Sequence, residues 1–87
     1  MSQDWELAIL RSDSQYGGCA SNRRVYDAIP KFVPLTKDHL KRQWGDHPAF
    51  QNQVRSHISN LCDKGELQKI RSGYHCLTEK GKARLSN

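Results

Sequence analysis

The chain has 87 residues, a length typical of one domain with a single small core. Its 14 Lys and Arg residues outnumber the 9 Asp and Glu residues and give a net charge of +5, which favours nucleic acid over a membrane surface as partner, because no segment combines a basic helical face with a broad apolar one. Because the first residues are polar and acidic, we expect no signal peptide. No apolar run approaches the roughly 20 residues of a membrane span.

The first predicted element is a helix over residues 5–10. Trp5, Ala8 and Ile9 share one face of it, at the spacing of a single buried stripe. Asp4 can cap its first turn. We therefore interpret Trp5 as a hydrophobic lid on the core.

A very short strand and a second helix follow. Cys19-Ala20 is predicted as the third strand of a small sheet, and Ser21 as the cap of a helix over residues 22–29. Arg23 and Arg24 lie in the first turn, where the helix dipole disfavours cations, so their placement does not serve helix stability. Contact of Ser21, Arg23 and Arg24 with DNA phosphates is one explanation, and a solvated basic face is the other.

Proline interrupts the connection to the next long helix. Pro30 and Pro34 exclude a regular helix between them. Residues 37–44 then predict one or two helical turns, which Gly45 ends. This connection is longer than the turn of a minimal helix-turn-helix, and the Pro30–Trp44 segment is left without an assigned role.

The longest predicted helix begins near Pro48, since a proline suits the first turn of a helix. Its apolar residues recur at spacings of four, four and three: Phe50, Val54, Ile58 and Leu61. Its other face carries amides, hydroxyls and one guanidinium, groups that pair with base edges in a major groove. The predicted base-reading residues are Gln51, Asn52, Arg55, Ser56 and Ser59. The alternative is a solvated polar face.

A basic hairpin and a short helix close the chain. Lys64-Gly65 is a natural helix stop, and Ser72-Gly73 predicts a tight turn between two strands. The predicted contacts with phosphates or the minor groove are Lys69, Arg71 and Tyr74, with His75 on the same hairpin. Tyr74 could equally close the core. Thr78 is predicted to cap a helix that ends near Leu85.

The order of these elements predicts an α+β fold, a winged helix-turn-helix of about four or five helices with a small antiparallel sheet. The distribution of charge along the chain agrees with this fold. Residues 18–43 and 64–87 each carry +4, while residues 44–63 sum to −1. This division suits flanks that bind phosphates and a central helix that reads bases.

The chain resembles the N-terminal winged-helix domain of Mrr-type restriction proteins over nearly its whole length. The matching pieces are Ala20-Ser21 with Val25, Asp27, Ala28 and Ile29; Phe50, Asn52, Val54, Arg55 and Leu61; Gly65-Glu66-Leu67; and Gly73-Tyr74 followed by LTEKGKARL. The resemblance implies a module that binds double-stranded DNA beside a nuclease domain. No nuclease domain follows here, so the sequence is expected to be either a fragment of a larger restriction protein or a free-standing binder.

Catalytic and metal chemistry find little support in the sequence. The four histidines and three cysteines lack the close pairs of structural zinc sites, so no metal, cofactor or enzymatic activity is predicted. Cys19, Cys62 and Cys76 show no paired spacing, which predicts unpaired cysteines and a cytoplasmic or nuclear protein. Cys62 and Cys76 are interpreted as small core residues.

Two other functions are compatible with the same fold, a free-standing transcriptional regulator and a protein-interaction or dimerisation module. For the latter, Phe32, Val33 and Trp44 could form an apolar patch outside the main helix.

Overall fold

The structure, a computed structural model, describes residues 5–33, 42–43 and 47–86. The helices of this part are α1 (Trp5–Gln15), α2 (Asn22–Ala28), the 3-10 turn η1 (Ile29–Lys31), α4 (Ala49–Asp63) and α5 (Glu79–Ser86). The strands are β1 (Cys19–Ser21), β2 (Arg42–Gln43), β3 (His47–Pro48), β4 (Leu67–Arg71) and β5 (Tyr74–Leu77). Strands β1, β5 and β4 form an antiparallel sheet in that order, and β2 pairs with β3. This is the predicted α+β winged-helix arrangement.

The helix and turn signals of the sequence are confirmed. The Ser21 hydroxyl accepts a hydrogen bond from the Arg24 amide at 3.3 Å and caps α2. Thr78 accepts one from the Gly81 amide at 3.2 Å and caps α5. Gly65 and Gly73, with φ of 79° and 75°, take the left-handed conformation that ends α4 and turns the hairpin.

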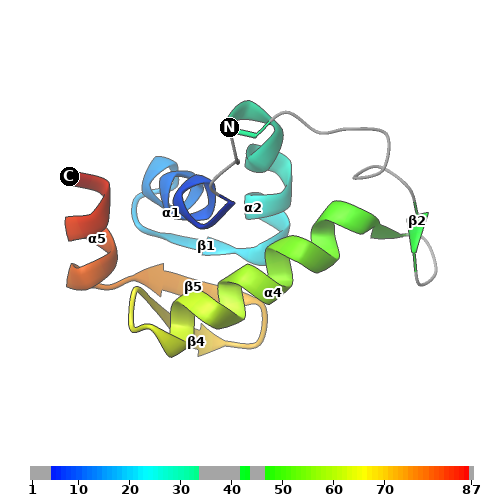
Figure 1. Ribbon diagram of the computed structural model, residues 1–87. Helices are drawn as coiled ribbons and strands as arrows, with labels where there is room; N and C mark the ends of the chain where they lie inside the picture. The colour runs from blue at the N-terminus through cyan, green and yellow to red at the C-terminus, as the bar shows by residue number, and fades with distance from the viewer. Residues whose placement is uncertain (1–4, 34–41, 44–46, 87) are drawn as a thin grey trace.

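The core lies where α1, α2 and the sheet meet the inner face of α4 (Figure 1). That face presents the predicted apolar stripe, and Val54 and Leu61 on it are completely buried. Trp5 is half-buried against this core, which confirms its interpretation as a lid. Helix α1 extends five residues beyond its predicted end and brings Asp13 into the interior.

Three expectations around the proline-rich connection are wrong. Arg42–Gln43 is a strand rather than part of a helix over residues 37–44, because its backbone pairs with β3; the remainder of that predicted helix lies outside the described residues. Pro48 belongs to β3, and α4 begins at Ala49. Val33 is buried in the core, so it cannot join the expected apolar surface patch with Phe32, which is exposed.

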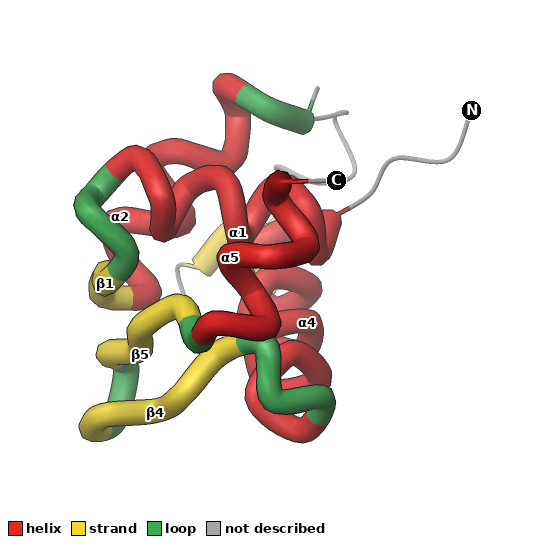
Figure 2. Tube along the Cα trace, turned by 90° about the vertical axis from the view of Figure 1, so that its left-hand side faces the viewer, coloured by secondary structure: helices red, strands yellow, loops and turns green. Residues whose placement is uncertain are grey.

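Helix α5 packs closely on the start of the hairpin. Gly81 is buried, and a Cβ atom built there would overlap the carbonyl oxygen of Glu66. Lys80 donates a hydrogen bond to the Lys64 carbonyl at 2.8 Å from the same helix. In Figure 2 the hairpin, α5 and the end of α4 are seen side by side.

Candidate nucleic-acid interface

The outer face of α4 is open to solvent. Arg55, Ser56 and Ser59 are exposed, while Gln51 and Asn52 are half-buried near the start of the helix. The period of the helix places these side chains away from the buried stripe. Helix α4 therefore presents the predicted polar surface rather than packing it into the interior.

The outer strand of the hairpin is also exposed. Lys69 and Arg71 lie on β4, at the edge of the sheet, and both face solvent. The Arg71 guanidinium lies over the Tyr74 ring, 4.8 Å from its centroid. This cation–π contact restrains the arginine on the hairpin. Tyr74 is half-buried, so its side chain belongs in part to the protein surface.

The start of α2 lies against the hairpin turn. The backbone amide of Asn22 donates a hydrogen bond to the backbone carbonyl of Gly73 at 2.8 Å. Arg23 and Arg24 are exposed, and the Arg24 guanidinium lies 5.3 Å from the centroid of the Tyr16 ring. Ser21 is half-buried, and its hydroxyl is engaged in the cap of α2.

A cavity of about 410 Å³ joins these elements. Its lining includes Arg55 and Ser59 of α4, Lys69 and Tyr74 of the hairpin, and Asn22 of α2. Residues of the predicted reading surface and of the hairpin are thus brought to one cleft. The other predicted site residues do not line it: Gln51, Asn52, Ser56, Ser21, Arg23, Arg24 and Arg71. We name this space the α4–hairpin cleft.

Electrostatic effects beside the cleft follow from burial. Burial raises the pKa of the Tyr26 phenol, an effect that the nearby Arg55 guanidinium and a hydrogen bond with Asn22 oppose. Burial likewise raises the pKa of the Cys62 thiol, and the charge of Asp63 adds to the increase. A thiol with a raised pKa stays protonated at neutral pH and is a poor nucleophile.

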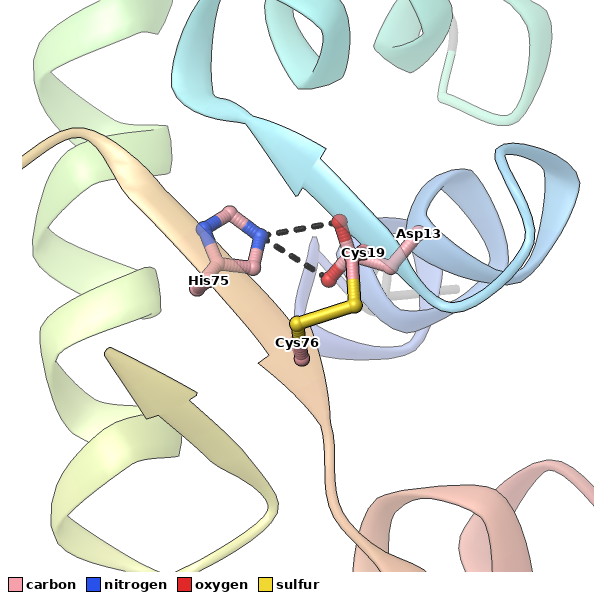
Figure 3. Close-up of a disulfide and its surroundings, with 4 residues drawn as sticks. All are labelled: Asp13, Cys19, His75 and Cys76. Carbon is pink, nitrogen blue, oxygen red and sulfur yellow. Dashed lines mark hydrogen bonds and ion pairs between the residues drawn. A yellow bond between two sulfur atoms is a disulfide. The ribbon is translucent and has the colours of Figure 1, made fainter. Parts of the chain in front are cut away.

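His75 is buried beside the cleft. The expectation that it belongs with the basic surface side chains of the hairpin is therefore wrong. Its side chain is only 2% exposed. Its Nε2 lies 2.8 and 3.0 Å from the two carboxylate oxygens of Asp13, which is completely buried (Figure 3). Burial raises the pKa of the Asp13 carboxyl, and the contact with His75 opposes this increase. Sequence analysis did not predict this pair, because its two residues are 62 positions apart in the chain.

The expectation of unpaired cysteines is wrong for Cys19 and Cys76, which form a disulfide (Figure 3). The two residues lie directly opposite each other in the β1–β5 register. They are 57 positions apart in the chain, so their spacing in the sequence does not predict the disulfide. The two cysteines meet only because β1 pairs with β5. Cys76 is therefore a covalent link between strands, whereas Cys62 is a free, half-buried thiol packed against the core.

A scan of protein-family models, a search of curated proteins and a search of solved structures each found no match to the chain. Within the described residues, no group of three or more His, Cys, Asp and Glu side chains could hold a metal ion. The helices of the same residues include none long and apolar enough to cross a membrane.

Proposed function

We propose that the chain is a double-stranded DNA-binding winged helix that acts without catalysis of its own. The observation that carries this proposal is the α4–hairpin cleft, where Arg55 and Ser59 of the helix and Lys69 of the hairpin lie together. A base-reading helix and a cationic hairpin must face the same side to contact one duplex. The net charge of +5 supplies long-range attraction to the phosphates.

The two elements contribute differently in this proposal. Arg55 lies on an exposed helical face among hydroxyl groups, where it can make a paired hydrogen bond with a guanine edge. Arg71 is held over Tyr74 on the outer strand, where it meets a phosphate or the adjacent minor groove. Helix α4 therefore supplies sequence preference, and the hairpin supplies affinity common to all sequences. Arg23 and Arg24 extend the phosphate contacts from α2.

The resemblance to Mrr-type restriction proteins supports a more specific role. On that basis we propose the recognition module of a restriction or modification-dependent nuclease, in which the nuclease domain or subunit performs the cleavage. A single-chain regulator and a protein-binding winged helix use the same fold. Binding to a DNA duplex would distinguish the nuclease recognition module and the transcriptional regulator from the protein-binding winged helix.

The test is a comparison of two arginine variants against a set of duplex sequences. Arg55→Ala should weaken the free energy of duplex binding by about 1–3 kcal/mol and relax the sequence preference at one base pair. Arg71→Ala should weaken all duplexes similarly and reduce the salt dependence of binding. Lys82→Ala is the matched control, because it removes one exposed cation from α5, away from the cleft.

Duplex binding is measured by fluorescence anisotropy across a series of salt concentrations. A negative slope of log affinity against log salt supports phosphate contacts. A slope near zero would favour a protein partner. Wild-type affinity of both arginine variants at low salt would show that the proposed interface is wrong.

A further inference from the structure

We propose that the α4–hairpin cleft accepts one nucleobase that has left the stack of the bound duplex. This inference rests on the proposed function and adds a base-binding pocket to it. The cleft volume of about 410 Å³ lies within the range of pockets that hold small molecules, roughly 300–1,000 Å³. A planar base is smaller than this space, so volume alone allows it to enter.

The walls of the cleft combine apolar and aromatic surface. Ile58 lines it and is only 8% exposed, so this part of the lining lies deep. Tyr74 lines it as well, with one face of its ring covered by the Arg71 guanidinium. Stacking on an aromatic ring beside apolar side chains is the usual way in which proteins hold an unstacked base.

His75 adds a buried hydrogen-bonding group. It lines the cleft, and its Nδ1 is buried without a hydrogen-bond partner among the described residues. Figure 3 shows this nitrogen on the side of the ring opposite Asp13, toward α4. When Nε2 donates to the Asp13 carboxylate, Nδ1 of a neutral imidazole accepts a hydrogen bond. An amino group or ring N–H of a base supplies the missing donor.

The charges around the cleft favour a nucleotide over a simple anion. Lys69 lines it and is exposed, so it can contact a phosphate that flanks an extruded base. Asp63 also lines it, and its carboxylate repels an anion but accepts a hydrogen bond from a base amino group. A free phosphate would therefore meet attraction and repulsion in the same space.

The first experiment compares three duplexes: fully paired, with one unpaired base, and with an abasic site at the same position. Extruding a paired base costs stacking and pairing energy, which an unpaired base does not require. We expect the duplex with the unpaired base to bind about 10-fold more tightly than the paired one. The abasic duplex should lose this advantage, because it offers no base to the cleft. Equal affinity for the unpaired-base and abasic duplexes would overturn the inference.

A variant pair at Cys62 tests the location. Cys62 lines the cleft without belonging to the proposed reading residues, so Cys62→Met should fill the space and remove the preference for the unpaired base. Cys62→Ala is the matched control and should retain it. If Cys62→Met does not fold, the three wild-type duplexes still decide the question. Retention of the preference in folded Cys62→Met would place the base elsewhere and overturn the inference.

Free ligands provide an independent readout. NMR titration with deoxynucleoside monophosphates should shift the Ile58 methyl and His75 ring signals, whereas inorganic phosphate should leave both unchanged. Identical responses to the two ligands would reduce the cleft to an anion site and overturn the inference. Absence of binding to any duplex would instead contradict the proposed function, so the two failures are distinguishable.

Discussion

Helix α1 holds two acidic residues that bind later parts of the chain in contrasting surroundings. Asp13 is completely buried against His75 of β5. Glu6 is partly exposed and accepts hydrogen bonds from Lys64 at 2.7 Å and Arg84 at 3.3 Å. A buried charge left without its partner is strongly destabilising, whereas a surface ion pair contributes little and is screened by salt. The first contact therefore fixes the hairpin, and the second only supports the packing of α5 and of the turn after α4.

The same contrast divides the hairpin itself. Its inner strand, β5, is attached to the body of the protein by His75 and by the Cys19–Cys76 disulfide. Its outer strand, β4, carries exposed Lys69 and Arg71. A rigid inner strand with a free outer strand holds the proposed contact residues in place at little cost in conformational entropy on binding.

The largest effect is expected from breaking the buried pair. His75→Ala should destabilise the protein by about 3–5 kcal/mol, because it leaves the Asp13 carboxylate buried without its partner. Asp13→Asn should lose less, since an amide oxygen can still accept from Nε2–H. Urea unfolding gives these free energies, with the exposed Asp27→Ala as control. A His75→Ala protein as stable as the control would contradict the assigned importance of the pair.

A smaller effect is expected from reducing the disulfide. Reduction should lower the free energy of unfolding by about 2–4 kcal/mol, as loss of a link that closes a long loop does. A thiol assay should count one reactive cysteine in the unfolded, non-reduced chain and three after reduction. Cys62→Ser should keep the response to reductant, and Cys19→Ser should abolish it. Three reactive thiols before reduction would show that the disulfide does not form.

The smallest effect is expected from the surface cluster, and it depends on pH. The hydrogen bond from Lys64, assisted by Arg84, holds the pKa of Glu6 below its ordinary value of 4.5 even though burial raises it. Its stabilisation is therefore complete above about pH 4.5 and is lost as the pH falls through the lowered pKa. Glu6→Gln should lower the free energy of unfolding by about 1 kcal/mol or less at pH 7. It should have no effect once the pH is below both the ordinary and the lowered pKa of Glu6.

Thermal unfolding at pH 7 and at successively lower pH measures this difference between Glu6→Gln and wild type. Glu79→Gln is the control, because the Glu79 side chain is 95% exposed and pairs only loosely with Lys82 at 3.6 Å. A cost of Glu6→Gln that persists unchanged in acid would assign the effect to packing rather than charge.

Local patterns in the sequence were sufficient to predict the elements that position the interface. The stripe from Phe50 to Leu61 predicts the orientation of α4, and glycines at the end of α4 and in the hairpin predict where the chain turns. These signals act within a few residues of each other, so no tertiary information is required. The exposure of Arg55 follows from the same helical stripe.

Contacts between distant segments could not be predicted in this way. Lys69 and His75 are paired in the β4–β5 register and share one face of the sheet, yet His75 is buried and Lys69 is exposed. The difference arises because β5 is the central strand of the sheet and β4 is its edge. The Asp13–His75 and Cys19–Cys76 pairs arise only after α1, β1 and β5 meet. The cleft likewise depends on the distance between α4 and the hairpin, a property that periodicity does not contain.

The buried glycine of α5 sets a limit on engineering this scaffold. Exchanging a helical glycine for alanine is an ordinary way to stabilise a protein by up to about 1 kcal/mol. At Gly81 the added methyl group would collide with the main chain at Glu66, so the helix would have to shift away from the hairpin. Such a shift would also disturb Arg84, which reaches Glu66 at 2.7 Å from the same helix. A thermostability programme guided by helix propensity alone would therefore weaken the molecule at this position.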